Sequence, residues 1–278
     1  MPPGPLRVCT APLVAGGKHS TLKQKGKNRM PEDTQIIKIR RADTLGQAQS
    51  GSVTLRCHFA FADYHAPEYE HEGRLRAINL GSLRPGDTYA LGPQANVDIV
   101  TWLRAGSVHT QAAGFAPDAI QAGGLHLLGA GTGVNAIAWH AGADGASFIQ
   151  FWLLADTEGD SPTQESRSAF PAMEDGGFRI IASGFPEDDP EAMEVIKDGA
   201  PVVLSGRNRL LHAHIPAGQG AAYQTTQGRD LHILVVAGRI TLSGTVLSGG
   251  DGAMLEQASS VVVMAAEDSE VILTDVAS

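Results

Sequence analysis

The two halves of the chain repeat one pattern of turn, polar segment and apolar strand. The first copy reads RPGDTYALGPQANVDIVTWLRAG (84–106), and the second reads IPAGQGAAYQTTQGRDLHILVVAGRITLSG (215–244). In each copy a turn leads through a strand and a polar middle into an apolar strand that is followed by Ala-Gly. Self-similarity of this kind indicates an internal duplication. The repeat therefore predicts two similar domains in tandem.

Short runs of alternating apolar and polar residues fill both halves of the chain. In the first half they are IIKIRR, SVTLRCHFAFA, LRAINL, VDIVTWL and FIQFWLL, and in the second they include FRIIASG, PVVLSG, LLHAHIPAG, SVVVMAA and EVILTDV. Turn signals such as Pro85-Gly86-Asp87 separate them. Period-two alternation at this spacing predicts antiparallel sheets closed into sandwiches or barrels. We expect an all-β fold, with one helical segment at 190–197.

The predicted domain organisation has four parts. Residues 1–34 include a basic, polar stretch without apolar periodicity, so we expect a disordered extension, with a nucleic-acid or localisation arm as the alternative. Within it, Met30 is an alternative start of the natural chain. Residues 35–161 are predicted to form the first barrel, 162–176 a polar linker and 177–278 the second barrel.

The composition argues against several classes of function. The net charge of −9 disfavours binding to nucleic-acid phosphates, which needs a basic face. Cys9 and Cys57 lack C-x-x-C spacing, so neither a disulfide framework nor a zinc site is indicated. No apolar run approaches the roughly 18 residues of a membrane span, and the N-terminus has no continuous apolar segment typical of a secretion signal. We therefore expect a cytoplasmic protein without membrane contacts, as a monomer or weak homo-oligomer.

Two stretches keep the spacing of a two-part metal-binding motif. Gly86–Gly106 and Gly129–His140 have the layout of the cupin boxes, G-x5-H-x-H-x3-E-x6-G and P-x-G-x2-H-x3-N. At the histidine positions the first box has Gly92 and Gln94, and the second has Ala136. The frame of the motif is therefore kept while its imidazoles are missing.

Longer segments resemble those of the pirins, which are bicupin proteins. CHFAFADYHAPEYEHEGRLRAINL (57–80) resembles the family's H-T-F-S-F-x-x-Y-x-x-P…LRVIN stretch. NVDIVTWLRAG, GAGTGV and FIQFWLL are similar to the family's D-M-E-I-V-T-Y-V-L-E-G, S-A-G-T-G-V and L-Q-I-W-I segments. The resemblance covers about residues 35–276. It implies two cupin β-barrels of the jelly-roll type in tandem.

The resemblance also implies where a metal would bind. In pirins the first barrel holds iron or a similar divalent metal through both histidines of H-P-H and the histidine and glutamate of G-T-G-V-x-H-S-E. Here those positions hold Gly92, Gln94, Ala136 and Ala138. Glycine and alanine have no side-chain donor atom, and one carboxamide with the nearby Asp98 cannot replace the imidazoles. We therefore predict that this metal site, and any metal cofactor in it, is absent, and that the four positions line a pocket.

Other polar residues are candidates for a relocated site in that pocket. His109, His126 and His140 lie near the two boxes, and Asp98 stands at the acidic position of the first. The alternative is that these histidines are solvated or satisfied in the core and that Asp98 is a structural aspartate. Trp139 precedes His140 directly and could fill the space that the missing ligands leave.

The second half contains one H-x-H pair, His212 and His214. Because side chains two apart on a strand share a face, both rings are expected on one side of the sheet. The pair precedes the turn at 216–218, whereas the cupin box places its histidines after that turn. We therefore interpret it as a chance pair. Cys57 is interpreted as a small buried apolar group rather than a nucleophile.

Two classes of function follow. The favoured hypothesis is a non-catalytic pirin-like protein that binds a small molecule or a protein partner, in the regulatory or interaction role that the resemblance implies. The alternative is a quercetin 2,3-dioxygenase-like, metal-dependent oxidoreductase that uses a relocated site. Because that reaction needs a metal to activate oxygen or substrate, the missing ligands count against it.

Overall fold

The computed structural model describes residues 37–51, 53–170, 176–188 and 201–278. The extension predicted at 1–34 and the helix predicted at 190–197 lie outside these residues. Residues 35–278 form one compact unit.

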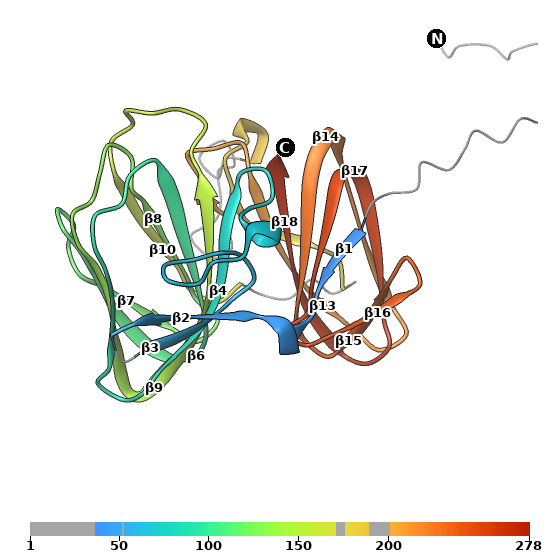
Figure 1. Ribbon diagram of the computed structural model, residues 1–278, viewed down its shortest axis with the longest axis horizontal. Helices are drawn as coiled ribbons and strands as arrows, with labels where there is room; N and C mark the ends of the chain where they lie inside the picture. Colours follow the sequence, from blue (N-terminus) through green and yellow to red (C-terminus); the bar gives the residue numbers. More distant parts are fainter. Residues whose placement is uncertain (1–36, 52, 171–175, 189–200) are drawn as a thin grey trace, which may run out of the picture. The chain divides into compact units, whose positions relative to one another are not determined.

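The described residues form two nine-stranded sheets (Figure 1). The first sheet has the order β10-β8-β6-β9-β4-β3-β2, with β5 paired to β9 and β7 to β6. The second has the order β12-β11-β13-β18-β14-β17-β15-β16, with β1 paired to β17. The all-β prediction is confirmed.

The strands of the first sheet are β2 Gly46–Ser50, β3 Val53–Cys57, β4 Leu75–Leu83, β5 Thr88–Leu91, β6 Val97–Ala112, β7 Asp118–Gln121, β8 Leu125–Gly129, β9 Ile137–Leu154 and β10 Thr163–Arg167. Those of the second are β1 Ile37–Arg40, β11 Arg179–Ser183, β12 Val202–Val203, β13 Arg209–Ile215, β14 Gly220–Ala237, β15 Arg239–Leu242, β16 Thr245–Ser248, β17 Gly252–Ala265 and β18 Ser269–Ala277. Single 3-10 turns are η1 Ala42–Thr44, η2 Pro67–Tyr69 and η3 Pro186–Asp188.

Two segments pair differently from the predicted division of the chain. Strand β1 lies in the second sheet, where Ile37 and Ile39 pack against the apolar core of the second barrel. In Figure 1 it is the blue strand beside the red and orange ones. Strand β10, which falls within the predicted linker, pairs with β8 of the first sheet. Neither pairing has a local sequence signal, because both join strands far apart along the chain.

The first barrel is filled by aromatic side chains. The Tyr89 ring stacks on Trp139 with ring centroids 5.3 Å apart and on Phe148 with centroids 5.7 Å apart. Trp139 is 1% exposed. Stacked rings of this size bury a large apolar area, so they stabilise a closed barrel interior.

A third apolar cluster joins the two sheets. Strand β6 contributes to two clusters at once, because Ile99 and Leu103 face the first barrel's interior while Val100 and Trp102 pack with residues of the second sheet. Residues 97–103 are all buried, so this stretch of the strand is covered on both faces instead of having a solvent-facing one. The space beside Trp102 is therefore shared by both halves of the chain.

Candidate functional site

The two box segments lie side by side in the first sheet. Gln94 and Val134 form a β-bridge, with backbone hydrogen bonds of 3.0 and 2.9 Å, and Ala138 pairs with Ala90 of β5. The structure thus brings together the segments that carry Gly92, Gln94, Ala136 and Ala138. Gly92 and Ala136 are exposed, and Gln94 and Ala138 are partly buried.

The side chains at these four positions offer few donor or acceptor atoms. A Cβ atom added at Gly92 would meet no atom within 4 Å, so the position has open space around it. The amide of Gln94 lies 3.5 Å from the Gly92 carbonyl oxygen, which leaves it a weak hydrogen bond at most. Glycine and alanine add no donor or acceptor side-chain atom.

Asp98 holds the two halves of the chain together. Its carboxylate is 1% exposed and accepts hydrogen bonds from the Ser205 backbone N–H and hydroxyl, both of 2.7 Å. Burial raises the pKa of Asp98, and the two bonds from Ser205 oppose that shift. With both oxygens already accepting hydrogen bonds, Asp98 acts as a structural group that anchors the loop after β12.

The histidines predicted near the boxes lie in two different environments. His109 and His140 are paired across β6 and β9, and His140 Nδ1 lies 2.8 Å from Thr88 Oγ1. His126 is fully buried on β8, and burial lowers its pKa to about 4. Among the described residues, none of these three histidines is part of a cluster of three metal-ligating side chains, and Asp98 is not either.

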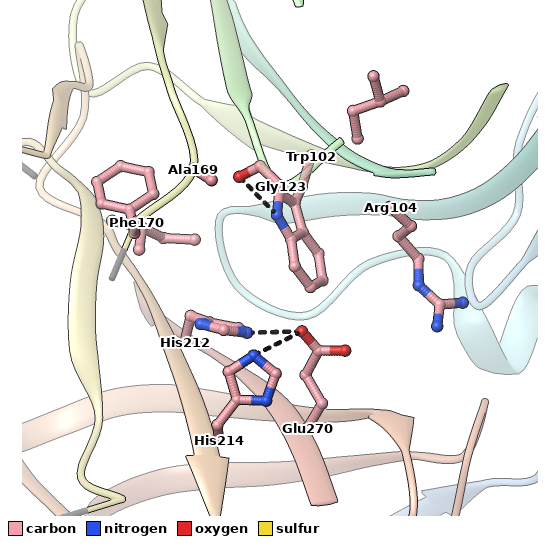
Figure 2. A pocket seen from close by; sticks show the side chains of 10 residues that line it. Trp102, Arg104, Gly123, Ala169, Phe170, His212, His214 and Glu270 are labelled. Atoms are coloured by element: carbon pink, nitrogen blue, oxygen red, sulfur yellow. Dashed lines mark hydrogen bonds and ion pairs between the residues drawn. The ribbon is translucent and has the colours of Figure 1, made fainter. Parts of the chain in front are cut away.

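The cluster of three that the described residues do contain is His212, His214 and Glu270. His212 and His214 project from one face of β13, and Glu270 on β18 pairs directly with His214. One carboxylate oxygen, Glu270 Oε1, lies 2.9 Å from His212 Nε2 and 3.3 Å from His214 Nε2 (Figure 2). The prediction of a shared strand face for the two histidines is confirmed. Their glutamate partner was not predicted, because only the strand order reveals it.

Electrostatics keep the glutamate of this cluster charged. Burial raises the pKa of Glu270, but the hydrogen bond from His212 and the nearby His212, His214 and Arg104 outweigh it, so the pKa is below its usual value. The carboxylate therefore carries its negative charge at neutral pH.

The cluster borders a cavity of ≈ 260 Å³ within the described residues. Strand β6 supplies Trp102 and Arg104, and the segment after β10 supplies Phe170. The Trp102 indole donates to the Gly123 carbonyl oxygen over 3.3 Å, and its ring centroid lies 5.0 Å from that of His212. In Figure 2 the Trp102 ring descends toward His212, while Arg104 lies on the Glu270 side. Aromatic faces, a cation and imidazoles thus border one space.

Comparison with known proteins identifies the family. Residues 197–276 match the family described as the quercetinase C-terminal cupin domain. A Pseudomonas aeruginosa protein, provisionally named a quercetin 2,3-dioxygenase, is 32% identical over 242 residues, which are 87% of this chain and 100% of that protein. This chain belongs to the pirin and quercetinase family of bicupins. The Escherichia coli K12 protein named quercetin 2,3-dioxygenase is 26% identical over 86% of this bicupin and 98% of its own length.

Solved structures share the bicupin fold. YhhW from Escherichia coli superposes with a TM-score of 0.76 at 24% identity, over 87% of this chain and 97% of that one. The nickel(II) complex of YhhW superposes with a TM-score of 0.74 at 23% identity, over 87% and 99% of the two chains. The predicted tandem cupin architecture is therefore confirmed.

The part of the chain that the structure describes contains no helix with the length and hydrophobicity of a membrane-spanning segment.

The residues at the four box positions of this bicupin do not fit a metal ion. Gly92, Ala136 and Ala138 have no donor atom, and Gln94 has one amide oxygen. By contrast, two imidazoles and a carboxylate meet beside the cavity between the sheets.

Proposed function

We propose that this bicupin is a quercetin 2,3-dioxygenase-like oxidoreductase, whose substrate binds in the cavity lined by Trp102, Phe170 and His212. The observation that carries the proposal is the lining of this cavity. Relatives that match this chain over nearly their whole length are named quercetin 2,3-dioxygenases, and their names support the reaction class. In a dioxygenase reaction both atoms of one O₂ molecule enter the organic substrate.

The cavity lining suits a planar polyphenol. Trp102 and Phe170 offer aromatic faces, and stacking of aromatic rings contributes roughly 0.5–1.5 kcal/mol beyond the burial of area. Arg104 offers a guanidinium group that can pair with a phenolate oxygen. The volume of this cavity, ≈ 260 Å³, is small compared with the roughly 300–1,000 Å³ of ligand sites. Part of a polyphenol bound in it would therefore remain in solvent.

The first barrel takes no part in this proposed chemistry. At its four box positions the ligand set of the pirins is lost, which makes it a degenerate metal site. The aromatic stack of Tyr89, Trp139 and Phe148 fills the interior and supports a structural role for this barrel.

The favoured hypothesis from the sequence, a non-catalytic binding protein, gains no support from the relatives that are named quercetin 2,3-dioxygenases. It remains the second candidate because of the missing donors at the box positions. The two candidates differ in one measurable outcome, which is turnover of a bound substrate.

The test uses quercetin and the full-length protein supplied with a divalent metal salt. We expect loss of the flavonol with uptake of one O₂ per molecule consumed. Phe170→Ala should raise the KM for quercetin on the order of 10-fold, since loss of an aromatic partner costs up to about 1.5 kcal/mol. Phe115→Ala is a matched control, because Phe115 is a partly buried phenylalanine that packs against the core of the first barrel.

Three outcomes decide between the candidates. Turnover that responds to Phe170→Ala and not to Phe115→Ala supports the proposal. Binding of quercetin at this cavity without O₂ uptake supports the non-catalytic candidate instead. If the protein neither binds quercetin nor turns it over, flavonols are not ligands of this chain.

A further inference from the structure

We infer that His212, His214 and Glu270 form a binding site for one divalent transition-metal ion on the second sheet. This site deepens the proposed function, on which it rests for its catalytic meaning, although the binding of metal is a separate property. The strand geometry creates the site. Residues two apart on β13 share a face, and the register places Glu270 of β18 opposite His214.

The two distances from the glutamate oxygen to the histidine nitrogens match the spacing of ligands in a metal centre. Ligands bound at roughly 2.0–2.2 Å from a common ion, with angles between about 90° and 110°, lie about 3 Å apart. Glu270 Oε1 lies 2.9 Å from His212 Nε2 and 3.3 Å from His214 Nε2. All three donor atoms fall within 4.8 Å of one another. Because two ligands of one ion lie at most about 4.4 Å apart, the two imidazole rings would rotate toward the ion as it binds.

The donor set narrows the choice of ion. Two imidazole nitrogens and one carboxylate oxygen suit iron(II), nickel, zinc and related divalent ions, whereas magnesium and calcium prefer oxygen ligands. Three protein ligands leave further coordination positions open. This set therefore predicts a reactive centre rather than a closed structural one.

The surroundings leave those open positions accessible. The side chains of His212 and Glu270 are 11% and 18% exposed, while that of His214 is 53% exposed. His214 and Glu270 also line a second cavity of ≈ 390 Å³ next to the first. A metal ion held here is anchored on a rigid sheet and faces space on both sides.

A plain ion pair is the competing explanation of the same contacts. Glu270 Oε1 can accept a hydrogen bond from a protonated His212 Nε2 and form an ion pair with a protonated His214. A metal ion would replace those two protons, so both explanations fit the distances. They differ in whether the protein binds one equivalent of metal through these three side chains.

The experiment measures metal binding by tag-free, full-length protein that has been stripped with a chelator. Isothermal titration with nickel(II) and cobalt(II) should give one site per chain. His214→Gln and Glu270→Gln should each weaken binding on the order of 100-fold or more, since even changes outside the ligand set cost 10- to 100-fold. The double variant His109→Gln/His140→Gln is the matched control and should bind as the wild type does.

Folding is checked by the thermal unfolding of each metal-free variant, and the exposed position of His214 makes that variant the safest one. Wild-type affinity in both His214→Gln and Glu270→Gln would overturn the inference, as would a loss of binding confined to the His109/His140 double variant. One bound ion without quercetin turnover would leave the metal site standing and contradict the proposed function. Quercetin turnover that persists in Glu270→Gln would leave the proposed function standing and contradict a catalytic role for this metal site.

Discussion

At the scale of single residues, the donor atoms decide what each barrel can bind. Gly92 and Ala136 of the first barrel bring no side-chain donor, whereas His212, His214 and Glu270 bring three donors to one point of the second sheet. The chemistry of the four box residues can be predicted from the sequence alone. The role of Glu270 cannot, because nothing near it along the chain marks it as the partner of a histidine pair.

Asp98 shows how a residue at a motif position can serve the fold instead. Asp98→Asn should lower the free energy of unfolding by about 1–3 kcal/mol, because an amide cannot accept both Ser205 bonds in the same way and leaves a buried donor unpaired. Urea unfolding measures the change.

The control for this prediction is Asp144→Asn, since Asp144 is an exposed residue. Its effect should stay within about 0.5 kcal/mol, as is usual for surface substitutions. Equal stability of Asp98→Asn and the wild type would show that the two bonds contribute nothing net.

At the scale of elements, the alternation of residues along β13 and the register of β13 with β18 determine different parts of the His212, His214 and Glu270 cluster. The period-two pattern of LLHAHI predicts that His212 and His214 share a face, and the structure confirms it. The register that brings Glu270 opposite His214 depends on the order of strands in the finished sheet. The same reason explains β1, whose sequence predicts a strand but not its place beside β17.

The frame of the first box can be tested as an element. In a Glu270→Gln background, which removes the inferred site, the four changes Gly92→His, Gln94→His, Ala136→His and Ala138→Glu should create one new metal site. The structure keeps the two box segments adjacent through the bridge between Gln94 and Val134, so the new ligands would meet. Nickel(II) titration measures the stoichiometry.

The background variant alone is the control for the restored box. A folded quadruple variant that binds no metal would mean that the two box segments do not bring these four positions together as ligands of one ion. The open space around Gly92 favours a successful restoration at that position.

At the scale of the whole molecule, the apolar cluster between the two sheets contains two buried histidines that should make the protein less stable in acid. His58 and His232 are each 1% exposed, and their ring centroids lie 5.8 Å apart. His232 also packs against Phe59 of this cluster at 5.7 Å between centroids. Burial lowers the pKa of His232 to about 3, and burial together with the neighbouring His232 lowers that of His58 well below its usual value.

These two histidines make the stability of the bicupin depend on pH. Below an unfolded-state pKa of about 6.5 the unfolded chain takes up a proton on each ring, while the folded protein does not until its own lower pKa is reached. Stability is therefore full above about pH 6.5 and falls with acidification by about 1.4 kcal/mol per pH unit for each buried histidine.

Removal of one of these rings should flatten that decline. Between pH 6 and 5, His232→Leu should reduce the slope of the unfolding free energy against pH by about 1.4 kcal/mol per unit relative to the wild type. Denaturant unfolding at several pH values measures both slopes, and His232→Gln provides the same comparison should leucine prevent folding. His71→Leu, at an exposed position, is the matched control and should leave the slope unchanged. Parallel slopes for the wild type and both His232 variants would mean that the buried ring gains its proton in the folded protein, through water that reaches the cluster between the sheets.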